Sequence, residues 1–317
     1  MRIGVILGIL SGLLWGLNDV FTNIFSLHIN LDLLPMVVIF SLSLAFLQDL
    51  GSSIGLLSFY AIKKEIKSQL HQSNNRLWII VIAAIFAGPL GMVAGILGIS
   101  YAGPVYAGVI TSCYPIVALV FSFFLIRERI TWLKVIGICL SVLAVIMISI
   151  EGSESDVSHV FLGMLFAACA MFGWGLESVL FAWVHKKTAL KPMWLLAIRQ
   201  LSSAITYLII LLMLFLIWWD EIIQTWMEMS IVDIILACIL SASFSYILYY
   251  HTIKRIGAAL GTTFNASFVF WAAIFSEIFG LSHLNYTFWL WALLLLVGIY
   301  CALSYHIKPR KVISNAH

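Results

Sequence analysis

The nine residues LLWGLNDVF (13–21) recur in the second part of the chain as FGWGLESVL (172–180). The Trp-Gly pairs of the two stretches align, with Trp15 falling on Trp174. Internal similarity at a wide spacing indicates a structural unit that is used twice. We therefore expect two related halves, each beginning with a helix that carries one of these stretches.

A second pair of stretches supports the repeat. YAGPVYAG (101–108) is similar to RIGAALG (255–261), and the similarity places Gly103 on Gly257. Both stretches come at the same point of their half, about three helices after the Trp-Gly pair. The similarity therefore extends beyond a single motif.

The composition places both halves in a lipid bilayer. Of the 317 residues, 63% are hydrophobic and 10% are charged, whereas soluble domains carry about 25% charged residues. A bilayer core about 30 Å thick needs about 20 mostly apolar residues for each helical crossing. Such runs fill nearly the whole sequence, so we expect no separate soluble domain. The formal net charge of +3 gives no support for nucleic-acid binding.

Charged residues and Gly, Pro or Asn divide the chain into ten expected transmembrane helices. Helices are favoured over strands because backbone groups in hydrocarbon must pair within their own segment. The helices are placed at 3–27, 33–60, 77–100, 104–126, 131–150, 160–184, 192–219, 230–254, 257–280 and 286–306. Because five is odd, the second unit (153–317) enters the membrane from the side opposite to the first (1–152). The expected fold is an all-α integral membrane protein with two inverted five-helix repeats in one membrane domain.

Basic residues set the expected orientation. Every Lys and Arg except Arg199 falls on one side of this layout. The connections on the other side carry acidic residues, namely Asp32, Glu151, Glu154, Asp156, Asp220, Glu221 and Glu228. Because positive residues resist translocation, we expect a multi-pass protein of the cytoplasmic (inner) membrane with both termini in the cytoplasm.

Five of the charged side chains within the expected helices are candidates for a role inside the membrane. They are Asp19, Asp49, Glu177, Arg199 and Glu277. A charge at mid-bilayer costs about 2.5–3.5 kcal/mol on insertion scales, so each needs a partner or a function. Glu277 is close enough to the membrane surface to be solvated. Arg199 either pairs with one of the other acids or contacts a ligand, and the sequence leaves both alternatives open.

Glu177 follows Trp174 by one helical turn, so both side chains project from about the same helix face. Trp15 and Asn18 repeat this spacing with a neutral amide. Aromatic rings around one carboxylate suit a quaternary ammonium cation, since each ring contributes about 0.5–2 kcal/mol. The competing interpretation is that these Trp residues lie at the bilayer surface or only pack, as most of the 12 Trp residues must.

Tyr246 and Tyr250 share a face of a later expected helix, because they are four residues apart. The predicted substrate-binding residues are Trp15, Asn18, Trp174, Glu177, Tyr246 and Tyr250. Ion coupling could involve Glu177, Asp19 or Arg199. We predict no catalytic residue, metal site or cofactor. None of the five Cys has a His beside it at metal-ligand spacing, and the sequence contains no HExxH or GxSxG motif.

The two-times-five layout with its repeated Trp-Gly pair resembles the drug/metabolite transporter superfamily (EamA-like). More narrowly, several strings are similar to the LicB-type choline permeases: AGPLGM (87–92), YP (114–115), WGLESVL (174–180), IRQ (198–200), YYHTIKRI (249–256) and TFNASFVFW (263–271). This resemblance implies choline import for decorating bacterial surface glycans. It also implies an aromatic box of Trp15, Trp174 and Tyr250, with Glu177 as the acid of the WGxES string. Asn18 and Asp19 depart from the pattern, which leaves a related amine or betaine open.

The expected function is secondary transport of choline or a similar quaternary amine by alternating access. The sequence contains no ATP-binding P-loop, so a proton gradient or the membrane potential is the expected driving force. The alternative within the same superfamily is an exporter of amino acids or drug-like amines. An intramembrane enzyme is a remote alternative, because only His251 lies near the predicted site. The oligomeric state is left open.

Overall fold

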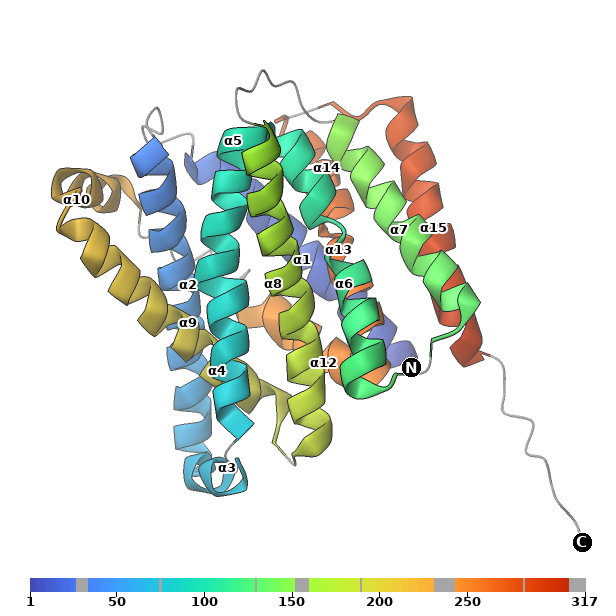
Figure 1. Cartoon of the computed structure of the whole chain (residues 1–317), viewed down its shortest axis with the longest axis horizontal. Coiled ribbons are helices and arrows are strands. Elements are labelled where there is room, and N and C mark those ends of the chain that lie inside the picture. Colours follow the sequence, from blue (N-terminus) through green and yellow to red (C-terminus); the bar gives the residue numbers. More distant parts are fainter. Residues whose placement is uncertain are drawn as a thin grey trace, which may run out of the picture.

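The computed structural model describes residues 1–26, 34–73, 76–128, 130–151, 160–188, 190–230, 243–281 and 283–307. In these residues the chain is helical and contains no strand (Figure 1). The first half contains α1 (Arg2–Ser26), α2 (Leu34–Ile62), α3 (Ile66–Gln72), α4 (Leu77–Ile85), the π-turn η2 (Phe86–Leu90), α5 (Gly91–Thr111), α6 (Tyr114–Phe121), η3 (Ser122–Ile126) and α7 (Trp132–Glu151). The second half contains α8 (Val160–Lys187), α9 (Pro192–Phe215), α10 (Trp219–Glu228), α12 (Tyr246–Ile256), α13 (Ala258–Ala266), α14 (Phe268–Ile278) and α15 (Tyr286–Ile307).

Eight helical stretches among the described residues are long and apolar enough to cross a membrane. One further apolar helix, Trp132–Ile148, is shorter and is not counted among the eight. Large apolar side chains such as Leu293 and Leu296 are exposed on the outside, as lipid contact requires. The predicted all-helical membrane fold is therefore confirmed. The helix expected at 230–254 falls partly on residues 231–242, outside the described residues, so the count of ten and the inversion of the halves stay predictions.

Helices from the two halves pack against each other rather than forming separate bodies. Helix α5 runs along α8, α7 along α15, and α2 along α9 (Figure 1). Helix α1 packs against α12, α13 and α14, which follow more than 200 residues later in the chain. The interior is therefore lined by residues of both halves.

The glycines of the two Trp-Gly pairs make matching contacts. A Cβ atom at Gly16 would lie 2.7 Å from the carbonyl oxygen of Phe268. One at Gly175 would lie 2.9 Å from the carbonyl oxygen of Tyr114. Each glycine thus lets its helix approach the backbone of a partner helix closely. The alignment that places Gly103 on Gly257 also places Tyr114 on Phe268. The two glycines therefore contact equivalent positions, as a repeat would produce.

Two of the expected helices are present as single apolar stretches, but each contains an interruption that the sequence analysis did not predict. The helix expected at 104–126 breaks between α5 and α6, and the one at 257–280 breaks at Ser267, between α13 and α14. The first break directly precedes α6, because Pro115 in the first turn of α6 has no N–H with which to continue the hydrogen-bond ladder of α5. At the second, the hydroxyl of Ser267 bonds the carbonyl of Phe264, which competes with the helical ladder.

Further boundaries differ from the prediction. The gap expected between residues 100 and 104 is helical, because α5 continues through it. The helix expected at 77–100 contains the π-turn η2, where Pro89 removes a backbone donor. The helix expected at 192–219 ends at Phe215, and the short helix α10 follows as a separate element.

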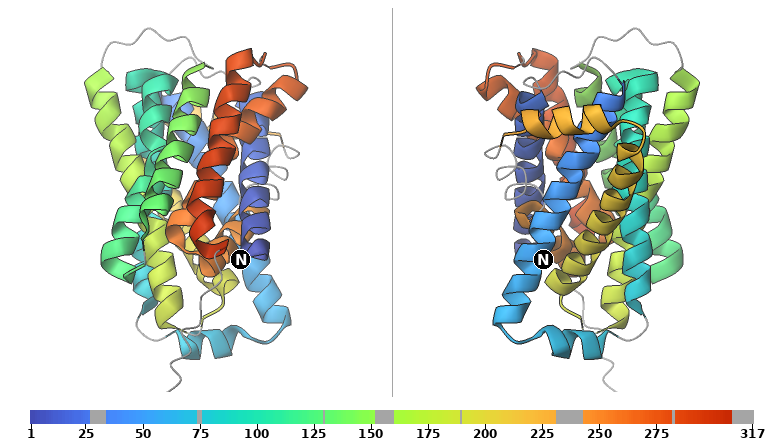
Figure 2. Two further views of the ribbon diagram at one scale, coloured as in Figure 1. Left: turned by 90° about the vertical axis from the view of Figure 1, so that its right-hand side faces the viewer. Right: turned by 90° about the vertical axis from the view of Figure 1, so that its left-hand side faces the viewer.

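The two ends of the bundle differ in charge. Helix α3 lies at one end and α10 at the other (Figure 2). Lys191 Nζ, from the connection between α8 and α9, lies 2.6 Å from Glu65 Oε2 beside α3, so these segments share the first end. The first turn of α10 carries Asp220 and Glu221. Lys186 and Lys187 in the last turn of α8 add positive charge at the α3 end. This end is the one expected to face the cytoplasm, and the orientation stays a prediction.

Candidate functional site

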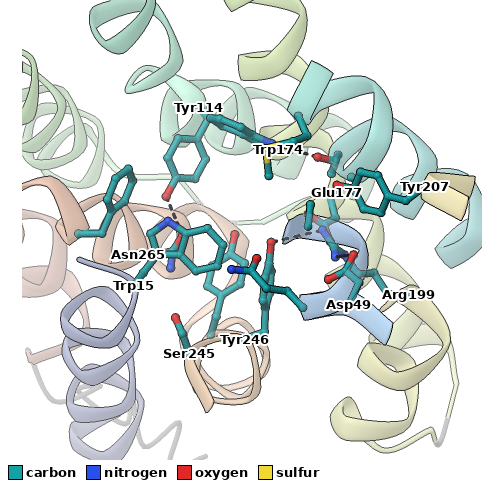
Figure 3. A pocket seen from close by; sticks show the side chains of 17 residues that line it. Trp15, Asp49, Tyr114, Trp174, Glu177, Arg199, Tyr207, Ser245, Tyr246 and Asn265 are labelled. Atoms are coloured by element: carbon teal, nitrogen blue, oxygen red, sulfur yellow. Dashed lines mark hydrogen bonds and ion pairs between the residues drawn. The ribbon is translucent and has the colours of Figure 1, made fainter. Parts of the chain in front are cut away.

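A cavity of about 100 Å³ lies inside the bundle, next to the two helix breaks. The side chains of 17 residues line it, and Figure 3 labels ten of them. The residues that begin α6 and α14, Tyr114 and Phe268, are both among them. Interrupted backbone at membrane depth is tolerated where it lines such a cavity. Since one water molecule needs about 10–15 Å³ of this kind of space, the cavity suits a small ligand.

One side of the cavity carries a buried charged cluster. Arg199 Nε donates to Glu177 Oε1 at 2.6 Å, and Arg199 Nη1 donates to Asp49 Oδ2 at 2.9 Å. All three side chains are less than 8% exposed. With both acids ionised, the cluster has two negative charges and one positive charge. In that state the cavity would carry one net negative charge, which a monovalent cation would neutralise.

Two tyrosines hold this cluster in place. The hydroxyl of Tyr250 donates to Glu177 Oε1 at 2.9 Å, and the Tyr250 ring packs against Phe181 with centroids 4.0 Å apart. Arg199 Nη2 donates to the Tyr246 hydroxyl at 3.3 Å, and the guanidinium carbon lies 4.8 Å from the Tyr246 ring centroid. Charged groups in hydrocarbon need such hydrogen bonds to be tolerated.

Aromatic rings form the walls beside the cluster. Trp174 stands edge-on to Tyr114, with centroids 6.3 Å apart, and Trp15 stands edge-on to Tyr246 at 5.2 Å. Trp174 Nε1 donates to the carbonyl of Ala87 in η2 at 3.0 Å, which fixes the orientation of the indole. The π-turn thus supplies the acceptor that anchors one wall of the cavity.

The opposite side of the cavity carries neutral polar groups (Figure 3). The Tyr114 hydroxyl lies 3.0 Å from Asn265 Oδ1 and 3.1 Å from the carbonyl of Thr262, and it can donate to either. Asn265 Nδ2 donates to Ser11 Oγ at 3.2 Å, and Ser245 Oγ donates to the carbonyl of Ser11 at 2.8 Å. This network ties α1 to α12 and α13 without a charge.

The structure brings most of the predicted site residues together. Those that line the cavity are Trp15, Trp174, Glu177, Tyr246 and Arg199. Tyr250 instead lies behind Glu177, which it positions. Asn18 is buried behind the lining, where its Oδ1 accepts from Gln48 Nε2 at 3.4 Å. Asp19 also lies outside the lining.

The sequence prediction omitted several lining residues. They are chiefly Asp49, Gln48, Tyr114, Tyr207 and Asn265. Asp49 had a signal, since it is a charge within an expected helix. Tyr114 and Asn265 lie within the quoted strings YP and TFNASFVFW, which also carried a signal. Among the described residues, no group of three His, Cys, Asp or Glu side chains could hold a metal ion.

Membrane-spanning helices around a cavity lined by both halves of the chain define the architecture of a small-molecule membrane transporter. The EamA-like transporter family matches residues 2–150 and 161–304, and the chain belongs to this family. The expectation that it is not an enzyme follows from this membership, because the family is one of transporters.

Two further proteins are similar over most of the chain. Protein LicB of Haemophilus influenzae is 26% identical over 269 residues, which cover 85% of this chain and 86% of that protein. One solved crystal structure covers 99% of this chain and 99% of its own, with a TM-score of 0.72 and 15% sequence identity. At that identity the likeness to the solved structure shows the fold alone.

Proposed function

We propose that the protein imports choline or a similar quaternary amine by secondary transport. One observation carries the proposal. The same buried cavity is lined by aromatic rings and by two carboxylates that share one guanidinium. One net negative charge suits a monovalent cation, and ring faces attract cations that are weakly hydrated. The resemblance of the cavity-lining strings to the LicB-type choline permeases supports the choice of choline.

The two sides of the cavity give the proposed substrate an orientation. The trimethylammonium group lies beside Glu177, against the rings of Trp15, Trp174 and Tyr246. The hydroxyl group of choline then faces Asn265, whose amide has hydrogen-bonding capacity beyond its two contacts with Tyr114 and Ser11. The small volume favours a substrate of this size over larger drug-like amines.

Transport is proposed to occur by alternating access, with two inverted halves rocking around the cavity. The α3 end faces the cytoplasm in this proposal, as do both termini. A membrane potential drives entry of a cation with about 2.3 kcal/mol per charge for each 100 mV. A proton gradient is the other proposed driving force, with Glu177 or Asp19 as the group that carries the proton.

Ligand competition tests the proposed substrate class. In calorimetry on the purified protein, choline and tetramethylammonium should bind, and acetylcholine or betaine should compete with them. Ethanolamine should not compete, because its ammonium group stays strongly hydrated and carries no methyl groups for the rings. Ethanolamine that binds as tightly as choline would contradict an aromatic cation site.

Export of amino acids is the second candidate, and the position of Arg199 favours it. A guanidinium that lines the cavity could pair with a substrate carboxylate, while Glu177 or Asp49 pairs with the amino group. This function predicts that zwitterionic amino acids displace choline in the same calorimetric experiment. Amino acids without any effect on choline binding would exclude it.

A further inference from the structure

Arg199 occupies the place in this structure that a substrate cation would take. Its guanidinium bonds Glu177 and Asp49 at 2.6 and 2.9 Å. It also lies over the ring of Tyr246, with the guanidinium carbon 4.8 Å from the centroid. A positive charge paired with a carboxylate and placed over an aromatic face is the arrangement proposed above for the quaternary ammonium. The cavity therefore already contains a cation that belongs to the protein.

We propose that Arg199 is a tethered cation that exchanges with the substrate: substrate binding displaces its guanidinium from Glu177, and Asp49 retains it. The inference rests on the proposed function, because it concerns how the same cavity is filled and emptied. Exchange gives each acid a positive partner both before and after substrate release. The net charge of the cluster changes from minus one without substrate to zero with it.

Burial explains why a stand-in for the substrate is needed. The side chains of Glu177 and Asp49 are only 6% and 7% exposed. A buried carboxylate that loses its partner is strongly destabilised, because neither water nor protein then compensates its charge. Without Arg199, the empty site would hold two such groups. With it, the transporter can release its substrate and return empty.

The contacts indicate which acid Arg199 leaves. Glu177 lies on α8 and keeps the hydroxyl of Tyr250, at 2.9 Å, when the guanidinium moves away. Asp49 lies on α2, which packs along the α9 helix that carries Arg199. Arg199 uses separate nitrogens for the two acids, so the bond to Asp49 can persist while the bond to Glu177 breaks.

A four-protein cycle tests the exchange by choline calorimetry on wild type, Asp49→Asn, Arg199→Gln and the double variant. Asp49→Asn should weaken choline binding by about tenfold, because the displaced guanidinium then has no acid to retain it. Adding Arg199→Gln to Asp49→Asn should restore the affinity to that of wild type or better. The double variant keeps Glu177 as the one charged group of the cluster. It contains no guanidinium that competes with choline for this carboxylate.

The double variant also limits the risk of misfolding, because it removes one acid together with the base. Arg199→Lys gives a second measurement that keeps the charge. Lysine lacks the planar fork that reaches both acids at once, so it should compete less and choline should bind more tightly. Weaker binding in Arg199→Lys, or a folded double variant weaker than Asp49→Asn alone, would overturn the exchange.

The cycle separates the two proposals. Wild-type protein that does not bind choline would refute the proposed function and the exchange together. Wild-type protein that binds choline, combined with no recovery in the double variant, would refute the exchange and leave the choline site standing. Recovery in the double variant supports both.

Discussion

The cavity has a charged side and a neutral side (Figure 3). On the charged side, Arg199 lies between Glu177 and Asp49. On the neutral side, Tyr114 and Asn265 bond each other without any ionised group. A ligand with a cationic head and a hydroxyl tail would be oriented by this difference alone.

The repeated positions show how the difference arises. Trp15 and Trp174 both line the cavity, so the aromatic part of the repeat is present in both halves. Glu177 lines it as well, whereas its counterpart Asn18 is buried behind the lining. The repeat therefore supplies rings on two sides and charge on only one. In the proposed function, this difference would hold a cationic substrate in one orientation.

Removing the charge should have the largest effect. Glu177→Gln should weaken choline binding by more than about 30-fold, because it removes the acid that the substrate and Arg199 share. Isothermal titration calorimetry on folded protein measures the change. Glu277→Gln is a matched control, since that acid bonds the backbone of Leu284 outside the cavity and is 42% exposed. Unchanged affinity in Glu177→Gln would mean that Glu177 only pairs with Arg199.

Removing a ring should have the next largest effect. Trp174→Ala should weaken choline binding by about 3- to 30-fold, the range of one cation–π contact, and Trp174→Phe should retain part of it. Trp15→Ala should behave in the same way. Thermal-shift titration with choline gives the comparison. Trp289→Ala, on the exposed face of α15, is the control. An alanine variant that binds as wild type does would remove that Trp from the site.

Changing the neutral side should have the smallest effect, and it should depend on the ligand. Asn265→Ala should weaken choline binding by about 2- to 10-fold, the effect of a neutral hydrogen bond. Tetramethylammonium has no hydroxyl, so its affinity should stay the same. Parallel titrations of the two ligands measure the ratio. An equal loss for both ligands would mean that Asn265 shapes the cavity rather than binding the tail.

The fold class could be predicted because it depends on composition and local pattern. Apolar runs of helical length and the Trp-Gly repeat were sufficient to predict a helical membrane bundle. The helix breaks were harder to predict. Pro115 marks the first break, but the second, at Ser267, has no proline or glycine beside it and depends on a side-chain hydrogen bond.

The site could be predicted in part, namely where its residues are related by a local sequence pattern. Trp174 and Glu177 are one turn apart, so their shared face follows from helical spacing. Asp49 and Arg199 are 150 residues apart, and they meet only because α2 packs along α9. Tyr207 lines the cavity with no local pattern that marks it. Residues that meet through tertiary packing were recognised as unusual, but their partners could not be assigned from spacing.

Uptake of labelled choline into proteoliposomes tests the central claim most directly. With an inside-negative membrane potential, wild-type protein should take up choline saturably, and tetramethylammonium but not ethanolamine should inhibit uptake. Glu177→Gln should reduce uptake towards that of protein-free liposomes, and a pH gradient applied alone shows whether protons contribute. Uptake by wild type no faster than by protein-free liposomes, or uptake unchanged by Glu177→Gln, would contradict the account.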